Sequence, residues 1–221
     1  MLGVVEVDRV KIPSEQEIER VFCERNGENI HKILKTSTVA IAGLGGLGSN
    51  VAFALTRAGV GGLKLVDFDR VDLSNLNRQQ YGIRHLGRYK TEALTEELLE
   101  VNPYLRIEYC TVRVDENNIA ELFGGFSVLC EAFDVPETKA MLVNLALEIL
   151  PDTIVVSATG MAGYGTANAI ETVKITDRFY LCGDRISELR PGSGLMAPRV
   201  MVCASHEAHM IIRILLGYKE P

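Results

Sequence analysis

The residues best suited to chemistry lie between positions 39 and 79, where an apolar run enters a glycine-rich turn. The turn contains Gly43, Gly45, Gly46 and Gly48. Glycines at this spacing let the backbone approach a pyrophosphate closely, and the N–H groups at the start of the next helix attract its negative charge. Because packing turns share this pattern, it predicts a phosphate site only where a strand precedes it and a helix follows.

The flanking sequence supplies that context. Residues 37–42 are predicted as a buried strand, 50–58 as the following helix and 63–66 as a second strand, which together form one βαβ unit. Asp67 follows the second strand about 20 residues after the turn, the spacing at which a carboxylate meets a ribose hydroxyl. The unit is therefore expected to bind a nucleotide.

Polar and cationic side chains follow Asp67 directly, and they are Asp69, Ser74, Asn75, Asn77, Arg78, Gln79 and Lys90. A dehydrogenase binds its cofactor intact and requires no such segment. A fixed guanidinium and ammonium, here Arg78 and Lys90, would instead stabilise the charge that spreads over phosphate oxygens during nucleotidyl transfer. Arg84 and Arg88 are interpreted as a solvated basic loop. The segment favours nucleotidyl transfer.

The segment from Gly43 to Gln79 resembles the ThiF and ubiquitin-activating-enzyme-like superfamily, which has the same glycine turn, aspartate-rich strand end and Ser-Asn-Leu-Asn-Arg-Gln sequence. The resemblance covers the chain from about residue 25 to the last helix. It implies an adenylyltransferase that uses ATP and Mg²⁺ to adenylate the C-terminal carboxylate of a ubiquitin-fold sulfur carrier protein. Such a ThiS-like carrier ends in Gly-Gly and serves thiamine or related sulfur-cofactor biosynthesis. The resemblance also implies a homodimer.

The same resemblance assigns roles to individual residues. Gly46 and Lys90 are expected at the phosphates, Asp67 at the ribose, and Asn75 and Arg78 at the triphosphate. The complete set expected to bind the nucleotide is Gly43, Gly45, Gly46, Gly48, Asp67, Asp69, Ser74, Asn75, Asn77, Arg78, Gln79 and Lys90. Asp134 follows an apolar strand at 126–130 and is expected to bind Mg²⁺, because one carboxylate plus phosphates is a normal magnesium site. The catalytic set is Arg78, Lys90 and Asp134.

Two further catalytic candidates come from the resemblance. Arg25 lies on a helix expected after the capping box at Ser14 and is a candidate to reach a neighbouring protomer's site, although a surface role is equally compatible. Cys182, expected in a loop, is a candidate to accept the activated tail, although an unpaired cysteine is more often inert.

The sequence also departs from the superfamily pattern. Val135 and Lys139 stand where an asparagine and an arginine are common. The five cysteines form no Cys-x-x-Cys pair, so no structural zinc is expected, as in a small zinc-less ThiF-like subgroup. His206 and His209, three residues apart, are expected to pack or contact solvent rather than bind metal.

The order of the remaining elements predicts a Rossmann-like, doubly wound α/β fold. Helices are expected at 91–101 and 136–150, with a short helix capped by Asp115, and strands at 105–112, 153–158 and 165–173. The sheet should be mostly parallel, with some antiparallel pairing in the C-terminal part. Residues 179–199 are expected to form a mobile or crossing loop. An N-terminal helical extension over 1–36 would precede one nucleotide-binding domain over 37–221.

Composition sets broader limits. The chain has 221 residues, 47% of them hydrophobic, enough for one sizeable core. A net charge of −6 argues against a general nucleic-acid binder. The N-terminus lacks the basic start and long apolar core of a signal peptide, and no apolar run reaches the roughly 18 residues of a spanning helix. The sequence therefore predicts a cytoplasmic protein without a membrane span.

Three alternatives stay open. Adenylation of a small molecule or a tRNA base would use the same fold and site. An NAD-dependent oxidoreductase would explain the turn and Asp67 but leave Arg78 and Lys90 without a role. A non-catalytic nucleotide-sensing subunit would follow if Val135 marked lost activity.

Overall fold

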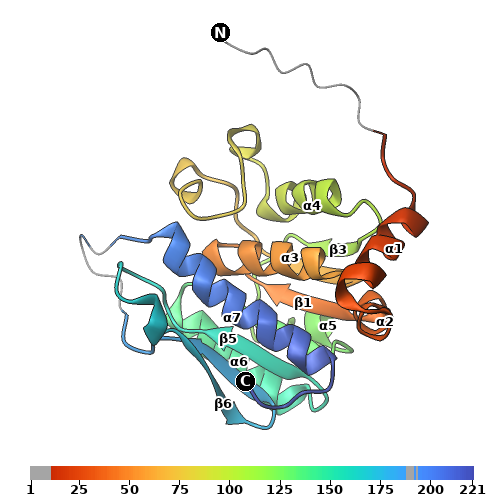
Figure 1. The fold of residues 1–221 in the computed structure, drawn as a ribbon. Helices are drawn as coiled ribbons and strands as arrows, with labels where there is room; N and C mark the ends of the chain where they lie inside the picture. Colours follow the sequence, from red (N-terminus) through yellow and green to blue (C-terminus); the bar gives the residue numbers. More distant parts are fainter. Residues whose placement is uncertain (1–10, 188–191, 193) are drawn as a thin grey trace.

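A seven-stranded sheet forms the centre of the computed structural model, which describes residues 11–187, 192 and 194–221 (Figure 1). The strand order is β3-β2-β1-β4-β5-β7-β6. All neighbouring strands pair in parallel except β6 and β7, which form an antiparallel hairpin at one edge. The strands are β1 Thr38–Ala42, β2 Gly62–Val66, β3 Arg106–Cys110, β4 Val128–Glu131, β5 Ile154–Ala158, β6 Glu171–Thr176 and β7 Phe179–Gly183. The predicted fold class is confirmed.

Helices cover both faces of this sheet (Figure 1). The α-helices are α1 Glu15–Asn26, α2 Glu28–Thr36, α3 Gly46–Ala58, α4 Lys90–Val101, α5 Ile119–Phe123, α6 Pro136–Ile149 and α7 Ala197–Leu215. Short 3₁₀ turns form at η1 Leu73–Asn75, η2 Ile83–His85 and η3 Ala167–Ala169. Helices α3, α4 and α7 lie on one face, and α5 and α6 lie on the other.

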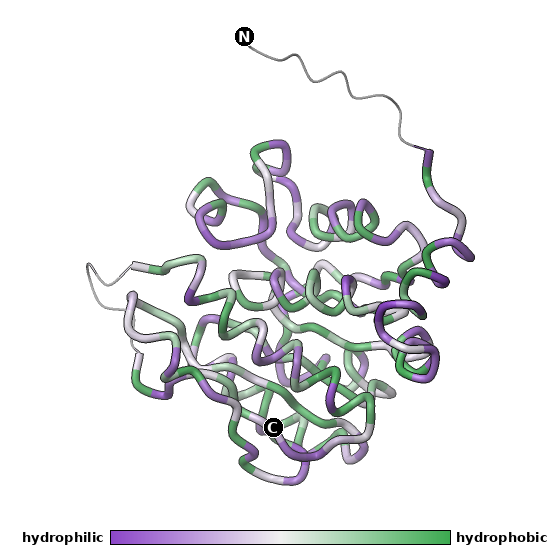
Figure 2. The backbone as a smooth tube through the Cα atoms, in the orientation of Figure 1, coloured by the Kyte–Doolittle hydropathy of each residue, from purple (hydrophilic) through white to green (hydrophobic). Residues whose placement is uncertain are grey.

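Strand β1 shows why both faces need cover. Val39 and Ile41 belong to the apolar cluster under α3, α4 and α7, whereas Ala40 and Ala42 belong to the cluster under α5 and α6. Alternate residues of a strand point to opposite faces, so a strand that is apolar throughout must be buried on both sides. Figure 2 shows hydrophobic residues concentrated along these central strands.

Two helices precede β1, and the first of them begins where the sequence predicts it. Ser14 caps α1 in a complete capping box with Glu17. No residue of α1 is buried, but α2 buries His31 and Leu34, and His31 stacks on Phe22 of α1. Helix α2 thus joins α1 to the main apolar cluster.

Two predictions in the C-terminal part are wrong. The strand expected at 165–173 begins only at Glu171, because Thr166 caps the 3₁₀ turn η3 and diverts the chain. The loop expected at 179–199 contains strand β7, inserted between β5 and β6, and the start of α7 at Ala197. Residues 188–191 and 193 of that predicted loop lie outside the described residues.

None of the helices that the structure describes is both long and apolar enough to span a membrane.

Candidate nucleotide-binding site

The candidate site lies at the carboxyl ends of β1 and β4, where the strand order reverses. From β1 the chain builds outward to β2 and β3, and then crosses back to place β4 on the other side of β1. In open α/β sheets such a reversal leaves a crevice in which ligands bind. Gly43 follows β1 there and Ala132 follows β4, so the two segments enclose the crevice.

The glycine turn is built so closely that two of its glycines admit no side chain. Gly43 has φ +91°, and a Cβ there would lie 2.8 Å from the Ala132 carbonyl oxygen. A Cβ on Gly48 would lie 1.9 Å from the Gly43 carbonyl oxygen. Helix α3 begins at Gly46, and no side chain of the described residues caps its N-terminus. Its first N–H groups therefore remain free to bind an anion.

Asp67 braces this turn from the end of β2. Its Oδ2 accepts a hydrogen bond from the Leu44 N–H at 2.7 Å, and its Oδ1 accepts one from the Asp69 N–H at 2.7 Å. Burial raises the pKa of Asp67, although Lys90 and these two N–H groups favour the charged form. A carboxylate has about four acceptor positions, so Asp67 retains capacity for ribose hydroxyls.

Lys90 is held at the edge of the site by Asp69. Its ammonium lies 2.8 Å from Asp69 Oδ2, and its side chain is only 8% exposed. The Lys90 N–H also donates to the Asp69 carbonyl at 2.9 Å. Because an ammonium carries three donors, Lys90 can keep this partner and still donate to a phosphate. In this structure Asp69 serves as the anchor of Lys90.

Arg78 lies over the N-terminus of α3. A Cβ on Gly46 would lie 3.5 Å from Arg78 Nε. Its Nη1 donates to the Ser74 carbonyl at 3.0 Å and to Asn77 Oδ1 at 2.8 Å. Burial lowers the pKa of the Arg78 guanidinium, and the charge of Asp134 opposes that shift. An arginine remains charged at neutral pH even so.

The other polar residues of the segment divide into two groups. Gln79 is buried and faces the turn, with its Nε2 3.8 Å from the position of a Cβ on Gly45. Ser74 and Asn75 instead support the loop itself, since Asn75 Oδ1 accepts from the Asp72 N–H at 3.0 Å and the Ser74 N–H donates to Asp72 at 2.8 Å.

Asp134 is exposed just beyond β4 and is the expected magnesium ligand. No group of three or more His, Cys, Asp or Glu side chains that could hold a metal occurs in the described part of the chain. The described residues therefore do not form a metal site made of protein ligands alone. Magnesium commonly uses one or two carboxylates together with substrate phosphates, and an exposed Asp134 beside a phosphate crevice fits that arrangement.

Residues 19–221 match the ThiF family. The chain belongs to the ThiF family. It is 31% identical over 193 residues to the molybdopterin-synthase adenylyltransferase of Salmonella typhimurium, an alignment that covers 85% of this chain and 76% of that protein. It is also 33% identical over 119 residues to the tRNA threonylcarbamoyladenosine dehydratase of Escherichia coli, covering 53% of this chain and 44% of that protein.

The fold of this ThiF-family chain is similar to that of a solved dehydratase structure. The E. coli tRNA N6-threonylcarbamoyladenosine dehydratase in complex with AMP superposes with a TM-score of 0.81 over 94% of this chain and 98% of that chain. The sequence identity across that superposition is 19%, so the likeness concerns the fold.

Sequence reasoning missed the residues that fasten the polar loop to the glycine turn. Asn50, in α3, donates to the Arg78 carbonyl at 3.1 Å and accepts from Gln80 Nε2 at 2.7 Å. The Tyr81 hydroxyl donates to the Leu44 carbonyl at 2.8 Å. The polar pair Ser49-Asn50 in the first turns of an otherwise apolar helix was the available signal.

Cys182 does not lie in a loop, so the placement predicted for it is wrong. It lies on β7, is fully buried, and pairs in register with Ala158 of β5. Burial, with a smaller contribution from Glu207, raises the pKa of the Cys182 thiol to about 12, although Thr172 opposes the shift. The thiol is therefore protonated at neutral pH and lacks the character of a nucleophile.

Arg25 is not among the residues that line the crevice described above, and it lies near the C-terminal end of α1. It is exposed in the last turn of α1. Within the described residues it forms no ion pair or side-chain hydrogen bond.

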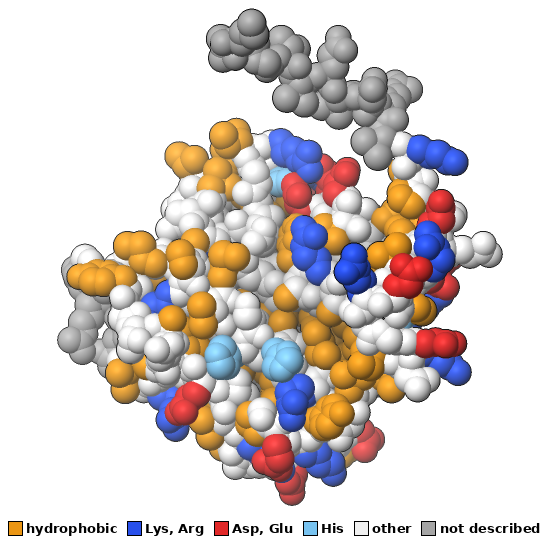
Figure 3. Space-filling view, in the orientation of Figure 1, with side chains coloured by type: hydrophobic (Ala, Val, Ile, Leu, Met, Phe, Trp, Pro, Cys, Tyr) orange, Lys and Arg blue, Asp and Glu red, His pale blue; other side chains and the backbone are white. Residues whose placement is uncertain are grey.

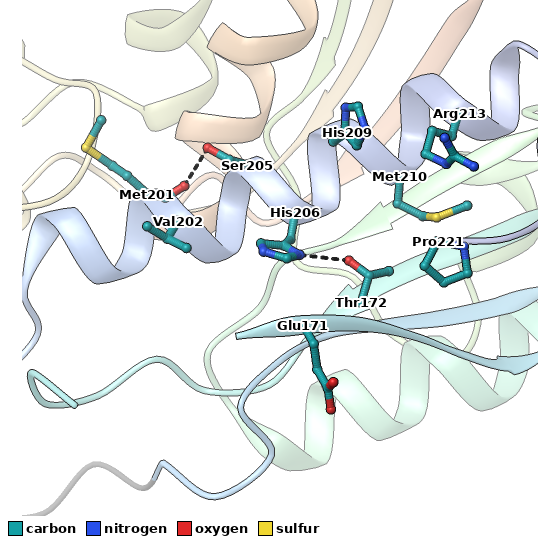
Figure 4. A pocket seen from close by; sticks show the side chains of 10 residues that line it. All are labelled: Glu171, Thr172, Met201, Val202, Ser205, His206, His209, Met210, Arg213 and Pro221. Carbon is teal, nitrogen blue, oxygen red and sulfur yellow. Dashed lines mark hydrogen bonds between the residues drawn. The ribbon is translucent and has the colours of Figure 1, made fainter. Parts of the chain in front are cut away.

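A cavity of about 590 Å³ lies outside the candidate site, between β6 and α7 (Figure 4). Met201 and Met210 line it, together with His206 and His209. His206 Nδ1 lies 3.0 Å from Thr172 Oγ1, so Thr172 of β6 holds this ring from the opposite wall of the cavity. The space-filling view shows hydrophobic side chains scattered over the same face of the molecule (Figure 3).

Proposed function

We propose that this protein is an ATP-dependent adenylyltransferase that acts on the C-terminal Gly-Gly carboxylate of a ThiS-like, ubiquitin-fold sulfur carrier protein. The observation that carries the proposal is the uncapped N-terminus of α3 at the switch point of the sheet, with Arg78 over it and with Asp134 two residues after Ala132, whose carbonyl faces the glycine turn. The names of the relatives support the reaction class, because one is a molybdopterin-synthase adenylyltransferase. A solved neighbour contains AMP.

The proposed pose follows from the charges. The triphosphate lies against the free N–H groups of α3 and beneath Arg78, and the ribose hydroxyls reach the open acceptor positions of Asp67. Lys90, anchored by Asp69, supplies a second cation at the phosphates. Asp134 would hold Mg²⁺ together with the phosphates, and the ion would withdraw charge from the phosphate oxygens.

The reaction needs no general base. A carboxylate at a chain terminus is already ionised at neutral pH. One of its oxygens forms a bond to the α-phosphorus while the bond from that phosphorus to the bridging oxygen breaks, and pyrophosphate leaves. Arg78 and Lys90 then act by stabilising charge on the phosphate oxygens, and the remaining catalysis is positioning.

We propose that the enzyme is a homodimer in the cytoplasm and that Arg25 of one protomer reaches the nucleotide site of the other. The exposure of Arg25 on α1 supports this assignment. Mixing Arg25→Ala protein with Asp134→Asn protein tests it, because mixed dimers contain one site with both native residues. Activity of the mixture above that of either variant alone supports the shared site. A mixture no more active than the two separate variants refutes it.

The acceptor is tested by mass spectrometry of the product. The enzyme, ATP and Mg²⁺ are incubated separately with a ThiS-like carrier, with the small carrier subunit of molybdopterin synthase, and with each carrier lacking its final Gly-Gly. The proposal predicts a mass increase of one AMP on an intact carrier and none on a truncated one. Which carrier reacts decides between thiamine and molybdopterin synthesis.

A tRNA base is the second candidate acceptor, and a particular observation favours it. The E. coli tRNA threonylcarbamoyladenosine dehydratase is among the chain's relatives, in sequence and in fold. The net charge of −6 argues the other way, because phosphate-rich ligands select basic surfaces. Consumption of ATP that depends on tRNA and not on either carrier would replace the carrier proposal.

A further inference from the structure

A buried ion pair lies directly behind Asp134. Glu131, the last residue of β4, is fully buried, and its Oε2 lies 2.8 Å from the ammonium of Lys139 on α6. The Ser157 hydroxyl on β5 donates to the same oxygen at 2.5 Å. A buried carboxylate is costly unless it is paired and hydrogen-bonded, and here both conditions are met.

The pair holds both polar backbone groups of one residue. The Phe133 N–H donates to Glu131 Oε1 at 2.7 Å. The Lys139 ammonium donates to the Phe133 carbonyl at 3.0 Å. Because Phe133 immediately precedes Asp134, the pair fixes the peptide plane from which the Asp134 side chain starts.

The other side of this turn is also fixed. The Ala132 N–H donates to the Ala42 carbonyl at 2.8 Å, and the Ala132 carbonyl meets the glycine turn at Gly43. Within the described residues, no side-chain hydrogen bond or ion pair orients the Asp134 carboxylate itself. Its position is therefore set by the backbone of residues 132–134, which the ion pair holds.

We infer that Glu131 and Lys139 are positioning residues that aim Asp134 at the nucleotide-bound cation. The inference rests on the proposed nucleotide site, but not on the identity of the acceptor. Loss of the Lys139 ammonium frees the Phe133 carbonyl and leaves Glu131 without its counter-charge. Nucleotide contacts from α3, Arg78 and Asp67 stay in place. The damage should therefore appear in the part of nucleotide binding that depends on Mg²⁺.

The test measures the dissociation constant of ATP by calorimetry in EDTA and again in saturating Mg²⁺, beside thermal unfolding of each variant. In EDTA, the dissociation constant of ATP for Lys139→Met should lie within about twofold of the native value. The factor by which Mg²⁺ lowers this constant should be about tenfold smaller than in the native protein, which is the usual scale for partners that orient a metal ligand. Lys139→Arg retains a positive charge and can donate to both Glu131 and the Phe133 carbonyl, so it should keep the native response to Mg²⁺.

Lys174→Met is the matched control. Lys174 also pairs with a carboxylate, at 3.1 Å from Asp177, and its side chain is 24% exposed against 17% for Lys139. It lies on β6, at the far edge of the sheet. This variant should bind ATP as the native protein does in both conditions.

Glu131→Gln changes the other partner of the ion pair, and it tests the positioning role if Lys139→Met does not fold. The amide oxygen can still accept from the Phe133 N–H, but the amide nitrogen cannot accept from Lys139. The same selective loss of the Mg²⁺ response is expected.

The outcomes separate this inference from the proposed function. A native Mg²⁺ response in folded Lys139→Met or Glu131→Gln overturns the positioning role alone. Equal losses in EDTA and in Mg²⁺, which Lys139→Arg does not restore, mark a general structural role and overturn it as well. A native protein that binds no ATP in either condition overturns the proposed function itself.

Discussion

Gly48→Ala tests whether the glycine turn is a close-packed element that admits no side chain. Two opposing effects act at this position. Alanine inside a helix is about 1 kcal/mol more favourable than glycine, so helix propensity alone predicts a stabilised protein. The added Cβ, however, would lie 1.9 Å from the Gly43 carbonyl oxygen and 2.9 Å from its carbon. Both atoms are backbone, so no side chain can rotate away.

The steric effect should win. Ordinary contact begins near 3.4 Å, so the turn must open by about 1.5 Å. Overpacking typically costs about 1–3 kcal/mol, occasionally more, and the larger end applies to a backbone contact. After the propensity gain, we expect the free energy of unfolding to fall by about 1–2 kcal/mol, which lowers Tm by about 2–8 °C in a chain of this size. ATP affinity should fall about tenfold or more as the turn moves.

Urea unfolding and ATP calorimetry measure both quantities. Gly82→Ala is the control, because a Cβ there meets nothing within 4 Å and its φ is −103°. This control should stay within about 0.5 kcal/mol of the native protein. A Gly48→Ala protein that is as stable as the control, and binds ATP equally well, would show that the turn is not packed as described.

Three further predictions concern single side chains. Arg78→Ala should lower the rate of ATP–pyrophosphate exchange by about 10²-fold to 10³-fold with unchanged Tm, and a loss under threefold would contradict its role at the phosphates. Burial raises the pKa of Glu207 well above its ordinary value, so the folded protein keeps it protonated while the unfolded chain ionises. Native stability should therefore fall as pH rises from about 5 to 8 more steeply than that of Glu207→Gln, and parallel pH profiles would refute this. Cys182, whose thiol pKa burial raises to about 12, should react with a thiol reagent at pH 8 only on unfolding. Cys182→Ala should keep full exchange activity, and its loss would revive the covalent role.

Local signals in the sequence were sufficient for the first βαβ unit. The apolar run at β1, the glycine turn and the apolar run at β2 each act over a few residues, so their pattern predicts both the elements and the site between them. The same locality explains the failure at β7. Phe179–Gly183 is short and glycine-ended, and it becomes a strand because β5 and β6 provide partners on both sides.

Contacts between distant residues were out of reach of the sequence for the same reason. The Asn77 amide donates to the Leu195 carbonyl at 3.1 Å across 118 positions. In the sequence, Lys139 stands out only because the superfamily commonly has an arginine there, and no local pattern distinguishes its partner Glu131. Their pairing depends on how α6 packs against β4, which no local pattern specifies.

The most direct test of the account is Mg²⁺-dependent ATP–pyrophosphate exchange with a ubiquitin-fold carrier from the same genome. The assay is run beside the carrier lacking its final Gly-Gly and beside Asp134→Asn enzyme. The account predicts exchange that requires both the intact tail and Asp134. Exchange that persists without either of them, or no exchange although ATP binds tightly, would contradict it.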